Sequence, residues 1–393
     1  MRFAFTAEDE AFRQEVRGFY QKELPPGWYN AMEEEATGYP FVRSVRKKLA
    51  ARGWLTMSWP REYGGQAAPV TRQLIFAEES ARARFEVARD SGVGYLGPAI
   101  MHHGTEEQKQ RFLGPISRAE LDFHQGFSEP DAGSDLAGLK TRADRDGDYY
   151  VIKGQKVWGG HLRHATYSFL LARTDQNAPK HKGISLLVIP ANTPGLKYEE
   201  FGNLGGGTQN LVYYDGCRVP ISECLIGEEN RGWYIATTVL NFERVVIEYA
   251  AAGQRYLEEV VEYWRSRGLH ERNDGVTLAL RHRLAEIAIE IEVCKMLAYR
   301  VGWVQMQGKI PTYESSTMKI FGSEMTQRFA HLATNVGGLF SEIARDGPES
   351  KYRPLRGRIE NNVPMQIIYS IVGGANEIQR GLIASRGLGL PRE

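Results

Sequence analysis

Residues 123–141 have the sequence FHQGFSEPDAGSDLAGLKT, and residues 151–165 have the sequence VIKGQKVWGGHLRHA. The first stretch places turn-forming residues between hydroxyl side chains such as those of Ser128 and Ser134. A loop of this composition lets backbone N–H groups approach a flat or anionic ligand closely. The second stretch puts Trp158 beside two glycines, where its ring could cover an aromatic cofactor. A surface turn and a core tryptophan are the simpler alternatives.

The overall charge of the chain excludes one large class of function. The 393 residues include 49 Lys and Arg against 48 Asp and Glu, which gives a net charge of +1. Without a large positive field, we do not expect nucleic-acid binding. A chain of this length also predicts two or three packed regions rather than one core.

Cysteine usage and hydropathy predict the compartment. The three cysteines are widely spaced and form neither a disulfide framework nor a metal-ligand motif, so no metal site is expected. The N-terminus lacks the apolar core of a signal peptide, and no apolar run reaches 18 residues. We therefore expect a cytoplasmic protein with no membrane span.

The first part of the chain predicts helices. Capping-box patterns occur at Thr6–Asp9 and at Thr105–Gln108, and the first precedes an apolar helical stripe over residues 12–20. Another helix is expected over residues 74–90. These signals predict an N-terminal helical domain over residues 1–120.

The middle of the chain changes character. Short β-rich runs alternate there with turn sequences; they are YYVI (149–152), YSFLLA (167–172), ISLLVI (184–189) and LVYY (211–214). This spacing predicts a central antiparallel β domain over residues 121–230. Helical periodicity then returns and predicts a C-terminal helical domain over residues 231–393. This α+β order argues against a doubly wound nucleotide fold, and neither common phosphate-binding glycine motif occurs.

The two opening stretches together resemble the paired signature of the acyl-CoA dehydrogenase family, E-P-x-A-G-S-D followed by G-x-K-x-W. Further matches follow in order along the chain: WPREYGG (59–65), HGTEEQK (103–109), CRVP (217–220), LIGEENRGW (225–233) and GGANEIQR (373–380). The resemblance implies that the C-terminal domain is a four-helix bundle and that FAD binds between the domains. It also implies a homodimer or homotetramer, because a second subunit completes each FAD site in the family.

The resemblance implies a set of site residues as well. Those expected at the FAD are Gln125, Phe127, Ser128, Trp158, Gly160, Arg267, Ala375, Asn376 and Glu377, and Arg267 would reach the FAD of a neighbouring subunit. Those expected at the acyl-CoA are Ser134 and Arg244. Asn376 also looks like an N-cap, and a helix starting there would offer N–H donors to an anionic group. Gly160 stands where the family usually has a Ser or Thr, and Thr334 stands where it commonly has a Gln.

The base that removes the substrate's α-proton is expected to be Glu243. The position of the base in many family members is Gly373 here. A minority, including isovaleryl-CoA, long-chain and bacterial steroid-type enzymes, carries the base in an E-R pair on a helix, and Glu243 matches that residue. On a helix, Glu243 shares an apolar face with Ile247, and desolvation there would raise its pKa toward neutrality. A surface glutamate or a structural ion pair is the alternative.

The activity implied by the resemblance is FAD-dependent dehydrogenation of an acyl-CoA to the 2-enoyl-CoA, with electrons passed to an electron-transfer flavoprotein. In the family, a helix-borne base accompanies branched, long or polycyclic acyl groups. Two alternatives stay open: oxidase or monooxygenase chemistry, and a non-catalytic partner subunit in a heterotetramer. The presence of Glu243 favours the dehydrogenase.

Overall fold

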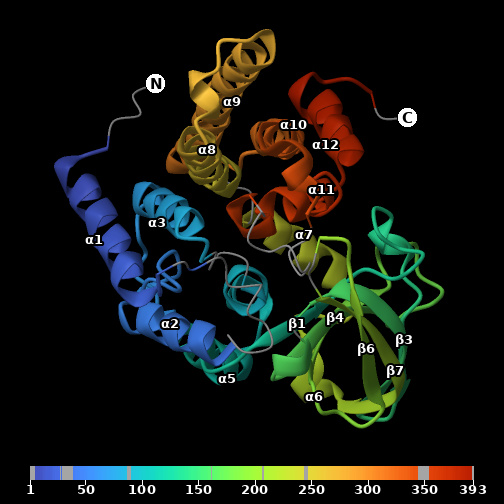
Figure 1. Cartoon of the computed structure of the whole chain (residues 1–393). Helices are drawn as coiled ribbons and strands as arrows, with labels where there is room; N and C mark the ends of the chain where they lie inside the picture. Colours follow the sequence, from blue (N-terminus) through green and yellow to red (C-terminus); the bar gives the residue numbers. More distant parts are fainter. Residues whose placement is uncertain are drawn as a thin grey trace.

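The computed structural model describes residues 5–26, 28, 39–85, 90–160, 162–205, 208–242, 247–343 and 354–391. Helices come first, a sheet follows, and helices return to the end of the chain (Figure 1). The predicted α+β class and the predicted order are therefore confirmed. Among the described helices, none has the length and apolar character that crossing a membrane requires.

The described residues of the N-terminal part form the helices α1 (Ala7–Glu23), α2 (Tyr39–Ala51), α3 (Val70–Arg82), α4 (Gly97–His103) and α5 (Glu106–Ser117), with the short turns η1 (Arg61–Tyr63) and η2 (Ser91–Leu96). Both predicted capping boxes are present at the starts of α1 and α5. The predicted stripe of α1 is buried at Phe12, Val16, Phe19 and Tyr20.

The helix expected over residues 74–90 is shorter than predicted. It begins at Val70 and ends at Arg82, where the N–H of Ala83 still bonds back to Glu79. Arg84 has a φ of +57°, in the left-handed region that a right-handed helix cannot contain. The prediction for residues 86–89 lies outside the described residues.

In the part of the chain that the structure describes, the sheet has eight strands: β1 (Phe123–Gly126), β2 (Arg142–Asp146), β3 (Tyr149–Gly159), β4 (Tyr167–Arg173), β5 (Ile184–Pro190), β6 (Leu196–Gly202), β7 (Thr208–Pro220) and β8 (Leu225–Ile226). Short helical turns accompany it: η3 (Leu136–Gly138), η4 (Leu162–His164) and α6 (Ile221–Cys224). The strand order is β6-β7-β3-β2-β4-β5-β8, and β1 pairs with β4 off this path.

The predicted central antiparallel domain is present, but the strand β1 departs from antiparallel pairing. This strand pairs with β4 in parallel, with Phe123 opposite Tyr167, and β2 meets β4 in parallel at one residue pair. The chain arrives at β1 from the N-terminal helices and reaches β4 only after β2 and β3, so no hairpin sets the direction of this pair. The other strand pairs are antiparallel.

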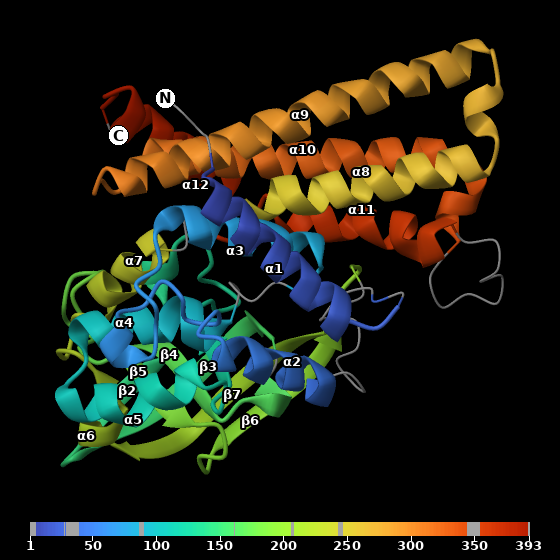
Figure 2. The ribbon, with the colours of Figure 1, turned by 90° about the vertical axis from the view of Figure 1, so that its left-hand side faces the viewer.

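The C-terminal part contains α7 (Gly232–Phe242), α8 (Glu248–Ser266), α9 (Gly275–Met306), α10 (Tyr313–Gly337), α11 (Arg358–Ile368) and α12 (Asn376–Leu382), with the short turns η5 (Leu269–Glu271), η6 (Gly338–Glu342), η8 (Pro354–Gly357) and η9 (Ile383–Gly387). Helices α8 to α11 lie side by side as a bundle (Figure 2). Their shared core includes Ile291, Cys294 and Met325.

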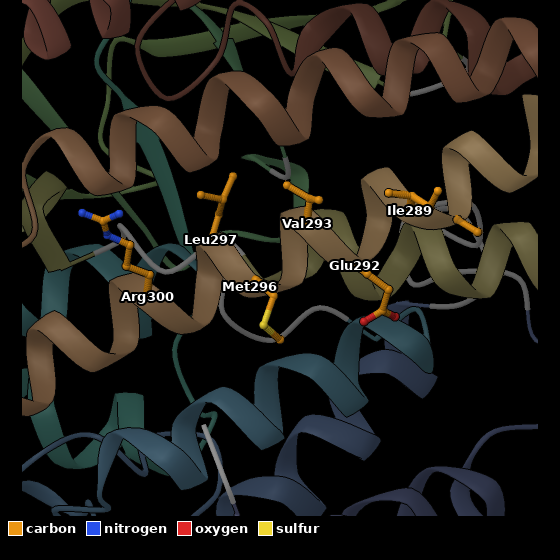
Figure 3. Close-up of a pocket in the computed structure, with 7 residues that line it drawn as sticks. Ile289, Glu292, Val293, Met296, Leu297 and Arg300 are labelled. Atoms are coloured by element: carbon orange, nitrogen blue, oxygen red, sulfur yellow. The ribbon is translucent and has the colours of Figure 1, made fainter. Parts of the chain in front are cut away.

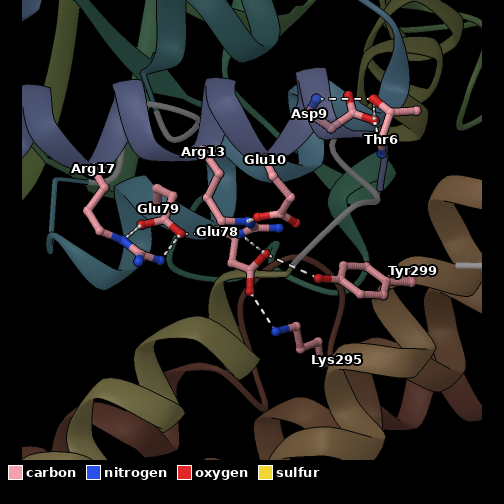
Figure 4. A network of polar contacts seen from close by, with 9 residues as sticks. All are labelled: Thr6, Asp9, Glu10, Arg13, Arg17, Glu78, Glu79, Lys295 and Tyr299. Atoms are coloured by element: carbon pink, nitrogen blue, oxygen red, sulfur yellow. Dashed lines mark hydrogen bonds and ion pairs between the residues drawn. The ribbon is translucent and has the colours of Figure 1, made fainter. Parts of the chain in front are cut away.

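A buried polar network joins the N-terminal helices to this bundle (Figure 4). Glu78 on α3 accepts hydrogen bonds from Arg13 of α1 at 2.7 Å and from Tyr299 of α9 at 3.2 Å. Its other oxygen lies 2.8 Å from the ammonium of Lys295. Burial alone would raise the pKa of Glu78, but Lys295 and Arg13 outweigh it and lower that pKa. The carboxylate therefore stays ionised and ties three helices together.

Candidate active site

A buried ion pair holds the two opening stretches together. Lys156 on β3 lies 2.9 Å from Glu129, and both side chains are almost fully buried. The Lys156 ammonium also donates to the carbonyl of Phe127, and the N–H of Val157 donates to the carbonyl of Ser128. The loop after β1 therefore lies directly against the end of β3. These contacts bring Gln125, Phe127 and Ser128 next to the Trp158 segment.

The Glu129 carboxylate is fully engaged by the protein. Beside Lys156, it accepts hydrogen bonds from the backbone N–H groups of Lys140 and Thr141. Burial would raise the pKa of Glu129, but Lys156 and these donors outweigh it and lower that pKa. Burial lowers the pKa of Lys156 to about 8, so the ammonium form persists at neutral pH. A charged pair at this depth stabilises the loop only while both partners are present.

Replacing Glu129 by glutamine is expected to destabilise the protein by roughly 3–5 kcal/mol, because an unpaired buried ammonium remains. Urea unfolding of the purified protein measures the change in the free energy of unfolding. The control is Lys140→Met, which removes an exposed pair with Asp131 and should cost about 0–1 kcal/mol. Equal stability losses in the two variants would show that the buried pair does not hold the loop.

Trp158 is the extra residue of a β-bulge. Val157 pairs with Leu211 and Gly159 pairs with Asn210, so Trp158 has no residue opposite it on β7. Its φ is +73°, a conformation that is strained for a bulky side chain and that occurs often at functional sites. Bulges of this kind redirect a side chain. The Trp158 ring is 60% exposed and touches Phe201 edge-on at 5.5 Å between centroids.

This arrangement fits a flat cofactor. The large exposed aromatic face of Trp158 stands beside a loop whose backbone is fixed by Glu129 and Lys156. Gly160 adds no side chain there, and a Cβ on it would meet only the Thr208 carbonyl at 3.8 Å. An aromatic ring system could therefore lie against Trp158 with its edge toward the half-buried Gln125, Phe127 and Ser128.

Behind this surface lies a chain of buried polar groups that the sequence did not reveal. His124 Nδ1 is 3.0 Å from Ser168 Oγ, which in turn is 3.1 Å from the hydroxyl of Tyr214. The His124 ring packs closely against Gly159: a Cβ on Gly159 would lie 2.2 Å from His124 Nε2 and 2.7 Å from the Gln125 carbonyl oxygen. The close approach of β1 to β3 therefore requires glycine at position 159.

The turn before α12 is held by side chains of α10. Gly373 and Gly374 have φ values of +70° and +87°, which favour glycine. The Lys319 ammonium donates to the Gly374 carbonyl and to Asn376 Oδ1, both at 2.9 Å. Burial lowers the pKa of Lys319 to about 8, with Glu377 and Glu324 opposing that shift. These hydrogen bonds fix the turn to helix α10 of the bundle.

The prediction that Asn376 is an N-cap is wrong. The cap position is Ala375, and Asn376 is the first residue of α12. The Asn376 amide turns back toward α10, because it supplies an acceptor to the buried Lys319 and also contacts Ser323. Its side chain is only 3% exposed, so the backbone of residues 375–377 and the exposed Glu377 side chain form the outer surface of this turn.

Comparison with known proteins identifies the fold and the family. Family models for the N-terminal, middle and C-terminal domains of acyl-CoA dehydrogenases match residues 6–120, 125–214 and 230–388. Acyl-CoA dehydrogenase FadE26 of Mycobacterium tuberculosis is 35% identical over 405 residues, spanning 100% of this chain and 99% of that protein. The chain belongs to the acyl-CoA dehydrogenase family.

Solved acyl-CoA dehydrogenase structures agree over the whole length. The Tcur3481-Tcur3483 steroid ACAD superposes with a TM-score of 0.90 at 35% identity, covering 100% of both chains. The ChsE4-ChsE5 complex from Mycobacterium tuberculosis gives 0.87 at 33% identity, again covering 100% of both chains. Members of this family are FAD flavoproteins and oxidoreductases. The flat cofactor considered above for the surface at Trp158 is therefore FAD.

The remaining predicted residues of this acyl-CoA dehydrogenase lie in three places. Ser134 is exposed on the loop after β1. Arg267 is exposed at the C-terminal end of α8, where α9 begins, whereas α12 lies beside the opposite end of α9 (Figure 2). Glu243 and Arg244 lie outside the described residues, between α7 and α8. Among the described residues, no cluster of His, Cys, Asp and Glu is arranged to hold a metal ion.

Proposed function

We propose that this protein catalyses FAD-dependent α,β-dehydrogenation of an acyl-CoA thioester and passes the electrons to an electron-transfer flavoprotein. The observation that carries the proposal is the exposed Trp158 ring on its bulge, held beside the Ser128 loop by the Glu129–Lys156 pair. Residues in strained backbone conformations cluster at active sites and at sites that clamp a ligand, which supports a ligand at Trp158.

The FAD-binding residues of one subunit are Gln125, Phe127, Ser128, Trp158 and Gly160, together with the turn Ala375–Glu377. Trp158 covers one face of the ring system, and the loop after β1 contacts its edge. Arg267 serves the FAD of a neighbouring subunit. Its position at the other end of the bundle from α12 supports this assignment.

The reaction needs two groups: the cofactor, which takes the hydride, and one carboxylate, which takes the proton. Bound FAD supplies an acceptor for the hydride that leaves the β-carbon. Glu243 removes the α-proton, and Arg244 and Ser134 hold the thioester and its coenzyme part. Glycine at position 373, with its positive φ, leaves the usual position of the base without a carboxylate, which supports Glu243 in that role.

The substrate is an acyl-CoA with a bulky, polycyclic acyl group. The similarity to a protein described as a steroid ACAD supports this class.

The domain boundaries are residues 120/121 and 230/231. The location is the cytoplasm, where the three unpaired, buried cysteines would stay reduced. The protein assembles as a homodimer or homotetramer. A heterotetramer is the second candidate, since the ChsE4-ChsE5 relative is described as a complex.

A panel of acyl-CoAs with an artificial electron acceptor tests this proposal. Steroid-side-chain thioesters are expected to have a kcat/KM at least about tenfold above that of straight short-chain thioesters, a difference of about 1.4 kcal/mol in transition-state binding. The product should be the 2-enoyl-CoA, identified by mass. Hydrogen peroxide as the main product would indicate oxidase chemistry. A colourless protein that gains FAD only when a homologous subunit is co-expressed would indicate the heterotetramer.

A further inference from the structure

Lys319 of helix α10 holds its charge inside the bundle. The side chain is 7% exposed, and its ammonium donates to the Gly374 carbonyl and to Asn376 Oδ1, both at 2.9 Å. Arg300, in contrast, is an exposed cation at the shallow hollow on the outer face of α9 (Figure 3). An exposed cation stays hydrated, whereas a buried ammonium costs free energy that its hydrogen bonds must offset.

Both acceptors of this ammonium belong to the turn of residues 373–377, which leads into α12. The turn contains two consecutive glycines with positive φ. Glycine loses more conformational freedom on folding than any other residue, so this turn needs fixed contacts to keep one shape. Gln379 supplies a weaker contact, because it donates to the Gly374 carbonyl at 3.3 Å and is itself held by Ser316 of α10.

Asn376 shows how far the turn depends on the lysine. Its Oδ1 accepts from Lys319 at 2.9 Å and from Ser323 at 3.2 Å, and its backbone N–H donates to the Ser370 carbonyl. Without the ammonium, Oδ1 and the Gly374 carbonyl would each lose their shortest hydrogen bond. The backbone of residues 373–377 would then be held only by the longer contacts.

The ammonium lies among charges of both signs. The titratable groups around this part of α10 include Glu324 on α10 itself, Glu377 and Arg380 on α12, Tyr249 on α8 and Tyr369 after α11. Arg380 is paired with Glu324. Burial lowers the pKa of Lys319 to about 8, although Glu377 and Glu324 oppose that shift. Lys319 is therefore protonated at neutral pH and loses its charge in mildly alkaline solution.

We propose that Lys319 is a positioning residue for the cofactor, whose ammonium holds the turn of residues 373–377 in the shape that binds FAD. The inference rests on the proposed function in assigning this turn to the FAD site. It adds that the affinity for FAD depends on one buried proton. A neutral amine still donates hydrogen bonds, but they are about half as strong as those of an ammonium.

The proton of Lys319 affects stability and FAD affinity in opposite directions. The folded protein releases it at about pH 8, whereas an unfolded chain keeps it up to the ordinary pKa of 10.5. Between these values the unfolded state binds more protons, so at this site the free energy of unfolding of the cofactor-free protein rises with pH. The affinity for FAD should fall over the same range, because the turn loses its charge-assisted hydrogen bonds.

The pH dependence of FAD binding tests the proposal. The dissociation constant of FAD is measured on the purified full-length protein, from the free flavin after dilution, between about pH 7 and about pH 9.5. In the native protein it should rise about tenfold above pH 8. Lys319→Arg keeps its charge throughout, so its dissociation constant should stay level. Lys319→Met should weaken binding about 10–100-fold at pH 7, with no further change at higher pH.

The control is Lys309→Met, the same change at an exposed lysine shortly before α10, which should keep the FAD dissociation constant within about twofold at every pH. The pKa of Lys156 is also lowered to about 8. A fall in affinity with pH that persists in Lys319→Arg would therefore belong to another group and would overturn the proposal. Equal FAD affinity in the native protein and in Lys319→Met would overturn it as well.

Two further measurements separate this inference from simpler explanations. Urea unfolding of the same samples shows whether Lys319 only packs the bundle, in which case Lys319→Met loses stability but keeps its FAD affinity and the native pH profile. Turnover of the acyl-CoA panel on FAD-saturated samples separates it from the proposed function. A protein that binds FAD with the expected pH profile but oxidises no acyl-CoA contradicts only the proposed reaction. An active enzyme whose FAD affinity ignores both pH and Lys319→Met contradicts only the role of Lys319.

Discussion

Replacing Glu243 by glutamine is expected to lower kcat for acyl-CoA dehydrogenation by about 10²–10⁴-fold, the usual contribution of a general base. An amide has nearly the same shape as a carboxylate but cannot accept the α-proton. FAD content should not change, because the FAD-binding residues lie elsewhere in the chain. Steady-state turnover with an artificial acceptor measures the loss. Exchange of the substrate's α-proton in D₂O should fall in parallel.

The control for this variant is a second glutamate close by in the sequence. Glu258 on α8 is an exposed residue that pairs with Arg82. Glu258→Gln should keep activity within about twofold, since exposed pairs contribute at most about 1 kcal/mol. Full activity in Glu243→Gln would remove the assigned base, whereas comparable losses in both variants would indicate a general effect on the fold.

Replacing Gly159 by alanine is expected to abolish or greatly reduce FAD binding. The new Cβ would lie 2.2 Å from His124 Nε2 and 2.7 Å from the backbone carbonyl oxygen of Gln125. The His124 ring is held by Ser168, so β1 and β3 must separate instead. Overpacking of this kind costs about 1–3 kcal/mol. The visible absorbance of the purified protein gives FAD occupancy, and urea unfolding gives the stability loss.

The adjacent residue supplies a matched control. Gly160→Ala makes the same chemical change one position later, where a Cβ meets only one atom, at 3.8 Å. This variant should fold normally and keep its FAD. If Gly159→Ala also retained full FAD occupancy, the close packing of His124 against β3 would not determine the shape of the flavin site.

Local signals in the sequence predicted local structure well. Thr6 and Asp9 lie three residues apart and satisfy each other's hydrogen bonds, so no distant residue was needed to find the start of α1. Asn376 looked like an equally good cap. Its amide is instead required by Lys319, which lies 57 residues earlier in the chain. A local pattern could not reveal a partner that only the folded bundle brings close.

In the sheet and in the site, too, local patterns were visible in the sequence, whereas contacts between residues far apart in the chain were not. Strands with alternating or strongly apolar sequences, such as β4 and β5, were visible from the sequence. The four-residue β1 was not, since its parallel pairing with β4 joins residues 44 positions apart. The motifs pointed to Trp158, but the bulge that exposes it depends on the register of β3 with β7. His124 gave no signal, because its importance comes from packing against Gly159.

The most direct test of the proposed dehydrogenase is anaerobic mixing of the purified protein with a steroid-side-chain acyl-CoA. The visible absorbance of the bound FAD should bleach, and one equivalent of 2-enoyl-CoA should form for each FAD reduced. An unchanged flavin spectrum with every acyl-CoA in the panel, from a protein that is fully loaded with FAD, would contradict the account.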